Sequence, residues 1–142
     1  MDDPVHYFAT ALIMGLGATL CFDLWGLALK WTLGIPPSNI CLVGRWMCGM
    51  PKGVFRHANI AASPPRRAEC AVGWIAHYLI GITFALAFAA LAGHGWLEHP
   101  TPLPAVVFGV LTVAAPFCIM QPAFGFGIAA SKSPHPAQAR LR

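Results

Sequence analysis

The chain has 142 residues, of which 57% are hydrophobic and 10% are charged, and its net charge is +4. A soluble domain of this size with a mean hydropathy of +0.63 would expose far too much apolar surface to water, so the composition indicates a membrane protein. The positive charge does not predict a nucleic-acid partner, because the basic residues are grouped where anionic lipid head groups would meet them first.

Three apolar segments, residues 5–32, 70–93 and 103–130, each exceed the roughly 20 residues that a helix needs to cross a bilayer. The N-terminus is acidic rather than basic, and the first segment is too long for a signal peptide, so we expect it to remain in the protein. The sequence therefore predicts an all-α, polytopic transmembrane bundle of one domain with three spans.

The basic residues set the expected orientation of these spans. All nine Lys and Arg side chains lie within residues 30–67 and 132–142. Because Lys and Arg are retained on the cytoplasmic side, loop 33–69 and tail 131–142 are expected in the cytoplasm and the N-terminus outside.

The long loop is expected to contain one short helix. Asn39 or Ser38 can cap it, and Pro51 ends it. Its apolar residues recur at helical spacing: Leu42, Val43, Trp46, Met47 and Met50. A helix of about 12 residues is too short to span, so we expect it to lie at the membrane interface or to fold back against the bundle.

The second span carries a regular ridge of small residues, which we call the glycine ridge. Its members recur at every fourth position, with one imidazole among them: Gly73, His77, Gly81, Ala85, Ala89 and Gly93. The first span has a small-residue face of its own, made by Ala11, Gly15, Ala18 and Thr19. Such faces allow close helix crossings, so we expect the glycine ridge to contact protein rather than lipid.

The third span contains Pro116 and Pro122, each of which removes one backbone hydrogen bond and bends the helix. Two interpretations stay open for this bend. It serves packing alone, or a polar cavity lies behind it.

Asp23 is the one acidic residue inside a predicted span, and a charge at that depth needs a partner within the bundle. At 1.5 Å per residue, Asp23, His77 and Gln121 lie about 10 to 16 Å from the cytoplasmic border of their helices, in roughly one layer. Three hypotheses compete for this layer: interhelical polar contacts that only hold the bundle together, a proton or cation relay, and haem ligation through His77.

Neither a structural metal site nor a disulfide is expected. His94, Glu98 and His99 lie in a short outer loop and are interpreted as solvated, although two imidazoles and a carboxylate could hold a metal. Five cysteines form an odd set without a C-x-x-C pair, and those outside the spans face the reducing cytoplasm, so we expect packing roles for them.

Several short motifs together resemble a family of small bacterial inner-membrane proteins of unknown function. They are Gly44-Arg45-Trp46, Gly53-x-Phe55-x-His57 and Glu69-x-x-x-Gly73-Trp74-x-x-His77-Tyr78. The resemblance implies about four transmembrane helices, and it singles out Arg45, His57, Glu69 and His77. A fourth span would be expected beyond Arg142, so the chain would stop before it.

The sequence contains no nucleophile–base pair, phosphate loop or convincing metal site, so it predicts a protein that is not an enzyme, and no cofactor is predicted. The leading hypothesis is an accessory or scaffold subunit that binds lipid and associates with itself or with a larger membrane complex through the glycine ridge. The alternative is a small transporter or proton-coupled channel that works through Asp23 and His77.

Overall fold

A computed structural model describes residues 4–141, and no strand occurs among them, so the expected all-α fold is confirmed. Three helices are long and apolar enough to cross a membrane. They are α1 (Pro4–Leu33), α3 (Glu69–Ala92) and a third helix that begins as α5 (Pro102–Thr112) and continues to Ala123. The bounds of α1 and α3 differ from the predicted spans by one residue at each end.

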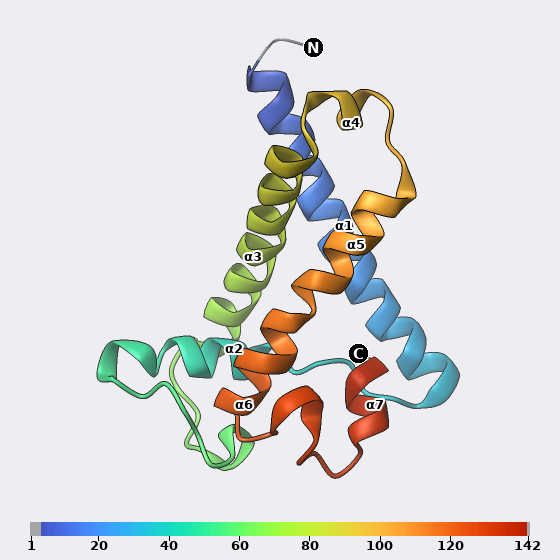
Figure 1. The fold of residues 1–142 in the computed structure, drawn as a ribbon. Coiled ribbons are helices and arrows are strands. Elements are labelled where there is room, and N and C mark those ends of the chain that lie inside the picture. The colour runs from blue at the N-terminus through green and yellow to red at the C-terminus, as the bar shows by residue number, and fades with distance from the viewer. Residues whose placement is uncertain (1–3, 142) are drawn as a thin grey trace.

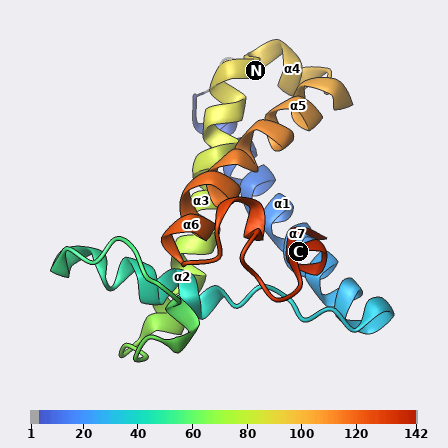
Figure 2. The same ribbon diagram turned by 60° about the horizontal axis from the view of Figure 1, so that its bottom comes forward.

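Short elements close the two ends of this bundle. One end holds α2 (Ile40–Met47), η1 (Met50–Lys52), η2 (Ile60–Ala62), η4 (Ile128–Ala130) and α7 (Pro136–Leu141). The other holds α4 (His94–Glu98) and the start of α1 (Figures 1 and 2). Both basic stretches of the sequence therefore lie at the same end, which we call the basic end.

Helix α2 is the short loop helix that the sequence predicts, and it lies across the lower end of α3 (Figure 1). Asn39 caps it, because its side-chain oxygen accepts a hydrogen bond from the backbone N–H of Cys41 at 3.1 Å. At the same end, Trp25 of α1 donates a hydrogen bond to the carbonyl of Leu141, so α7 is folded back onto the first span.

The glycine ridge of α3 packs within the chain. A Cβ atom added to Gly81 would meet the Thr19 hydroxyl, and one added to Gly15 would lie 2.7 Å from the Cα of Ile82. Ala11 and Ala89 are completely buried. The small faces of α1 and α3 thus meet each other. At these positions the ridge therefore has no free surface for the separate partner that the leading hypothesis requires.

The third span ends earlier than predicted and is loosely packed. It passes through a π-helical turn, η3 (Pro116–Met120), and through α6 (Gln121–Ala123). The segment from there to Ala130 forms turns and the 3-10 helix η4 rather than a continuous α-helix. The two prolines explain the irregular turn, since each removes a backbone donor. In the half of the span farther from the basic end, the ring centroid of Phe108 lies 5.2 Å from that of Phe88 on α3.

The basic end has a small apolar core beneath the loop, formed by Val43, Ile60, Ala123 and Phe124. Two backbone hydrogen bonds join the loop to the third span: His57 N–H to Ala123 O at 2.8 Å, and Ile60 N–H to Phe124 O at 3.0 Å. Gly125 follows with φ +86° and passes against the carbonyl of Ala58, where any side chain would clash. The loop therefore anchors the third span at this end.

Candidate functional site

Helices α2 and α3 cross at a pair of glycines, Gly44 and Gly73. A Cβ atom at Gly44 would meet the carbonyl oxygen of Glu69, and one at Gly73 would meet the carbonyl oxygen of Ile40. Backbone therefore lies directly on backbone, which only residues without a side chain permit. The crossing brings the residues that flank both glycines into contact, and we call this region the loop junction.

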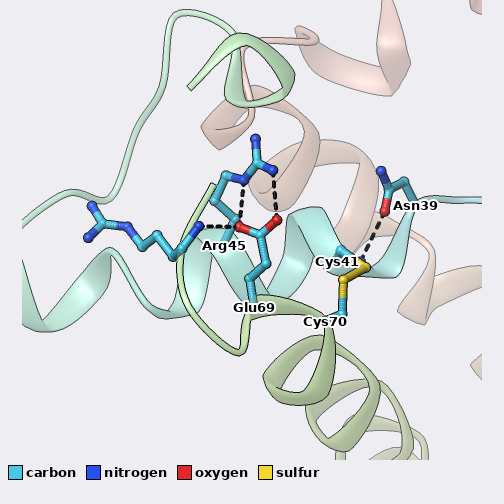
Figure 3. The surroundings of a disulfide bond; sticks show 6 residues. Asn39, Cys41, Arg45, Glu69 and Cys70 are labelled. Carbon is cyan, nitrogen blue, oxygen red and sulfur yellow. Dashed lines mark hydrogen bonds and ion pairs between the residues drawn. A yellow bond between two sulfur atoms is a disulfide. The ribbon is translucent and has the colours of Figure 1, made fainter. Parts of the chain in front are cut away.

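Arg45 of α2 and Glu69 at the start of α3 form a bidentate ion pair across the loop junction (Figure 3). Nε donates to Oε2 at 2.8 Å and Nη2 donates to Oε1 at 2.7 Å, while Nη1 donates to the carbonyls of Ile60 and Ser63. Each charged side chain is only 11% exposed. The hydrogen bond to Glu69 raises the pKa of Arg45, so the guanidinium stays charged and fastens the loop to α3.

His57 reaches the same region through Ser63. Its Nδ1 lies 3.1 Å from the Ser63 hydroxyl, which itself donates to the carbonyl of Asn59. Because the hydroxyl has a single hydrogen, Nδ1 must supply the hydrogen of the first bond. His57 Nε2 is buried without a partner in the described part of the chain. Arg45, Glu69 and His57, all singled out by the resemblance, thus converge.

A disulfide joins Cys41 of α2 to Cys70 of α3, and the prediction of no disulfide is wrong for this pair (Figure 3). Its cause lies in the crossing, because each cysteine precedes a crossing glycine by three residues. One helical turn therefore places the two sulfur atoms opposite each other. That shared spacing was the signal that the sequence argument overlooked.

Asp23 and His77 contact each other between α1 and α3. His77 Nε2 lies 2.9 Å from Asp23 Oδ1, and the Tyr78 hydroxyl donates to Oδ2 at 3.0 Å. An ionised carboxylate can only accept hydrogen bonds, so Nε2 carries the hydrogen when Asp23 is charged. The imidazole also lies near the rings of Phe22 and Trp74, with centroids 5.9 and 5.8 Å away. We call Asp23, His77 and Tyr78 the span cluster.

Gln121 does not take part in the span cluster. Its Oε1 is buried and has no hydrogen-bond partner among residues 4–141, and Tyr78 supplies the third polar group instead. Tyr78 was missed because the sequence argument sought one polar residue on each span, whereas two neighbours on α3 reach the same carboxylate. Haem ligation was one of three hypotheses and not the predicted outcome, and it would require His77 to use Nδ1 or to give up its bond to Asp23.

At the end opposite the basic end, the predicted loop that holds His94, Glu98 and His99 contains the short helix α4. The imidazole of His94 packs against the ring of Tyr7 on α1, with centroids 4.3 Å apart. Trp96 of the same helix packs edge-to-face on Phe88 of α3 at 4.6 Å. Two of the side chains in α4 therefore hold the first two spans together at this end.

Comparison with protein families places the whole arrangement in a known group. Residues 12–142 match the family described as protein of unknown function DUF2938. The chain belongs to this family. The match includes both the loop junction and the span cluster, and it agrees with the expected family of unknown function.

No curated protein and no solved structure matches the chain. What this DUF2938 chain does must therefore follow from its own side chains. Of its two polar clusters, the loop junction commits the Arg45–Glu69 ion pair to internal bonds, and His57 Nε2 beside it is buried without a partner in the described part of the chain. The span cluster holds groups that can exchange protons.

Proposed function

We propose that this DUF2938 chain is a small integral membrane protein that moves protons, alone or in exchange for another solute, through the span cluster. The observation that carries the proposal is the 2.9 Å contact between Asp23 and His77, which joins two helices long enough to cross a membrane. Carboxylates and imidazoles are the usual proton carriers in membrane transport. The role is transport rather than catalysis.

Exposure of the pair supports this role over a purely structural one. The side chains of Asp23 and His77 are 20% and 17% exposed, so a proton or a water molecule can reach them. By contrast, the Arg45 guanidinium uses its bonds to fasten the loop. A pair that served only to hold α1 to α3 would add little stability to this crossing, since the small residues of both helices already pack closely there.

Proteoliposomes with an imposed pH gradient test the proposal. The wild-type chain should carry a proton flux above that of empty liposomes, measured with an entrapped pH dye. Asp23→Asn should reduce the flux by at least about tenfold, because the amide cannot bind and release a proton near neutral pH. Glu98→Gln, in α4 at the opposite end, is the matched control and should leave the flux unchanged.

A wild-type flux no greater than that of empty liposomes would remove this proposal. It would favour the second candidate, an accessory or scaffold subunit of a membrane complex. That candidate is supported by the third span, because none of its apolar window is buried within the chain. A partner would then dock on this span and not on the glycine ridge, and Asp23→Asn would leave the assembly intact.

We also propose that the chain lies in a bacterial inner membrane with its basic end in the cytoplasm, because Lys and Arg side chains favour the cytoplasmic side. In a reducing cytoplasm the Cys41–Cys70 bond would be opened.

Thiol labelling tests the orientation in a variant that keeps Cys41, Cys48 and Cys70 and replaces Cys21 and Cys118 with alanine. A membrane-impermeant maleimide should label no cysteine in intact spheroplasts and all three after lysis. Labelling of Cys48 in intact spheroplasts would contradict the proposed orientation and place the basic end outside the cell.

A further inference from the structure

A hollow of about 240 Å³ opens beside the span cluster, between α1, the linker that follows α1, and α3. Its walls include Asp23, three aromatic side chains and two linker residues: Phe22, Trp25, Trp74, Pro37 and Ser38. The aromatic side chains are 47%, 55% and 45% exposed for Phe22, Trp25 and Trp74, so parts of their rings are open to a ligand. The hollow therefore combines one carboxylate with several aromatic surfaces.

The charge of Asp23 is not balanced by any fixed cation. Its two hydrogen bonds come from His77 and Tyr78, and no Lys or Arg of residues 4–141 forms an ion pair with it. Lys30 lies seven residues further along α1, about two turns away. When His77 is neutral, a full negative charge stays at the edge of the hollow, and in a membrane such a charge favours a cation nearby.

The aromatic walls select the kind of cation. Tryptophan and phenylalanine faces attract organic cations through their ring quadrupoles, most strongly where water is excluded. Both oxygens of Asp23 already accept hydrogen bonds, so the site has less to offer a ligand that must donate several hydrogen bonds or that keeps a hydration shell. A cation with apolar substituents suits the walls and the charge together.

We propose that this hollow binds a small organic monocation of the quaternary or tertiary ammonium class, held by Asp23 through charge and by Trp74, Trp25 and Phe22 through their aromatic rings. The inference rests on the proposed function, since it names the solute that the span cluster would exchange for a proton. At 240 Å³ the hollow lies near the lower limit of ligand pockets, roughly 300 Å³, which favours compact cations.

Protons compete with such a ligand. Protonation of His77 would neutralise Asp23 and remove the attraction for the cation, so binding should weaken as the pH falls. The titratable groups that contact Asp23 are His77 and Tyr78 of α3, and the two linker residues in the same walls, Pro37 and Ser38, are neutral. One site would thus bind either a proton or the cation, as an exchange carrier requires.

The test measures binding of benzyltrimethylammonium to the full chain in detergent or nanodiscs by titration calorimetry, at pH 8 and pH 5.5. Neopentylbenzene is the matched neutral probe, because carbon replaces the charged nitrogen in the same shape. Trp74→Leu and Trp25→Leu each remove one aromatic wall. Trp74→Phe keeps a smaller ring, and Trp31→Leu is the control, because Trp31 lies outside the hollow and is 76% exposed.

We expect the cation to bind wild type at least about tenfold more tightly than the neutral probe, and more tightly at pH 8 than at pH 5.5. Trp74→Leu should lose about tenfold in affinity, Trp74→Phe less, and Trp31→Leu nothing. Equal affinity for the two probes, or unchanged affinity in both Trp74→Leu and Trp25→Leu, would overturn the site. Cation binding without proton flux keeps the site and refutes the proposed function, whereas flux without binding refutes only the site.

Discussion

Replacing Gly44 with alanine is expected to lower the free energy of unfolding by at least about 3 kcal/mol, the upper range for overpacking a tight contact. The added Cβ would meet backbone atoms of Glu69 and Gly73, which cannot move aside as a flexible side chain can. Helix α2 would have to shift away from α3. The same shift would pull Arg45 from Glu69 and Cys41 from Cys70.

Urea unfolding in mild detergent, followed by circular dichroism, measures this loss. Formation of the Cys41–Cys70 disulfide in the purified protein under oxidising conditions, measured by gel mobility, should also fall in Gly44→Ala. The matched control is Gly109→Ala, a glycine within α5 whose added Cβ meets nothing within 4 Å. This control should be neutral or slightly stabilising, since alanine is the better helix former. A Gly44→Ala protein within about 1 kcal/mol of wild type would contradict the backbone contact.

Removing either partner of the Arg45–Glu69 ion pair should destabilise the basic end by about 3 kcal/mol. Each truncation leaves the other charge largely buried, and Arg45→Ala also removes the donor of the Ser63 carbonyl and one of the two donors of the Ile60 carbonyl. The double variant Arg45→Met, Glu69→Leu should cost less than the sum of the two single alanine variants, because it leaves no unpaired charge behind.

The same urea unfolding measures all three variants, and Arg67→Ala provides the control, since Arg67 is exposed and outside the junction. It should change stability by less than about 0.5 kcal/mol. If the loss in the double variant equalled the sum of the two single losses, the two side chains would act independently. That result would contradict the bidentate ion pair.

Hydropathy, charge and capping signals were enough to predict the first two spans and the short loop helix. The bounds of α1 and α3, the Asn39 cap of α2 and the grouping of the basic stretches at one end all follow from local signals. Helix-depth arithmetic also placed Asp23 and His77 in one layer, where the structure has them in contact. Local signals succeed here because a membrane leaves few alternatives to a helix.

Contacts between distant segments were less accessible. The disulfide depends on two helices crossing at Gly44 and Gly73, and no local sequence pattern predicts that these two glycines meet. The third span ends at Ala123 because Gly125 passes under the loop, a tertiary contact that hydropathy cannot register. The glycine ridge was identified as a protein contact surface, but periodicity alone could not say that α1 covers it.

One stripe of α3 carries Glu69, Gly73 and His77 at four-residue intervals. The first binds Arg45, the second touches α2, and the third holds Asp23. Two turns of a single helix are stiff, so one rigid segment of α3 carries both the Arg45–Glu69 ion pair, which is the clamp, and the His77–Asp23 contact. Any tilt that loosens the clamp would change the distance between His77 and Asp23 in the same movement.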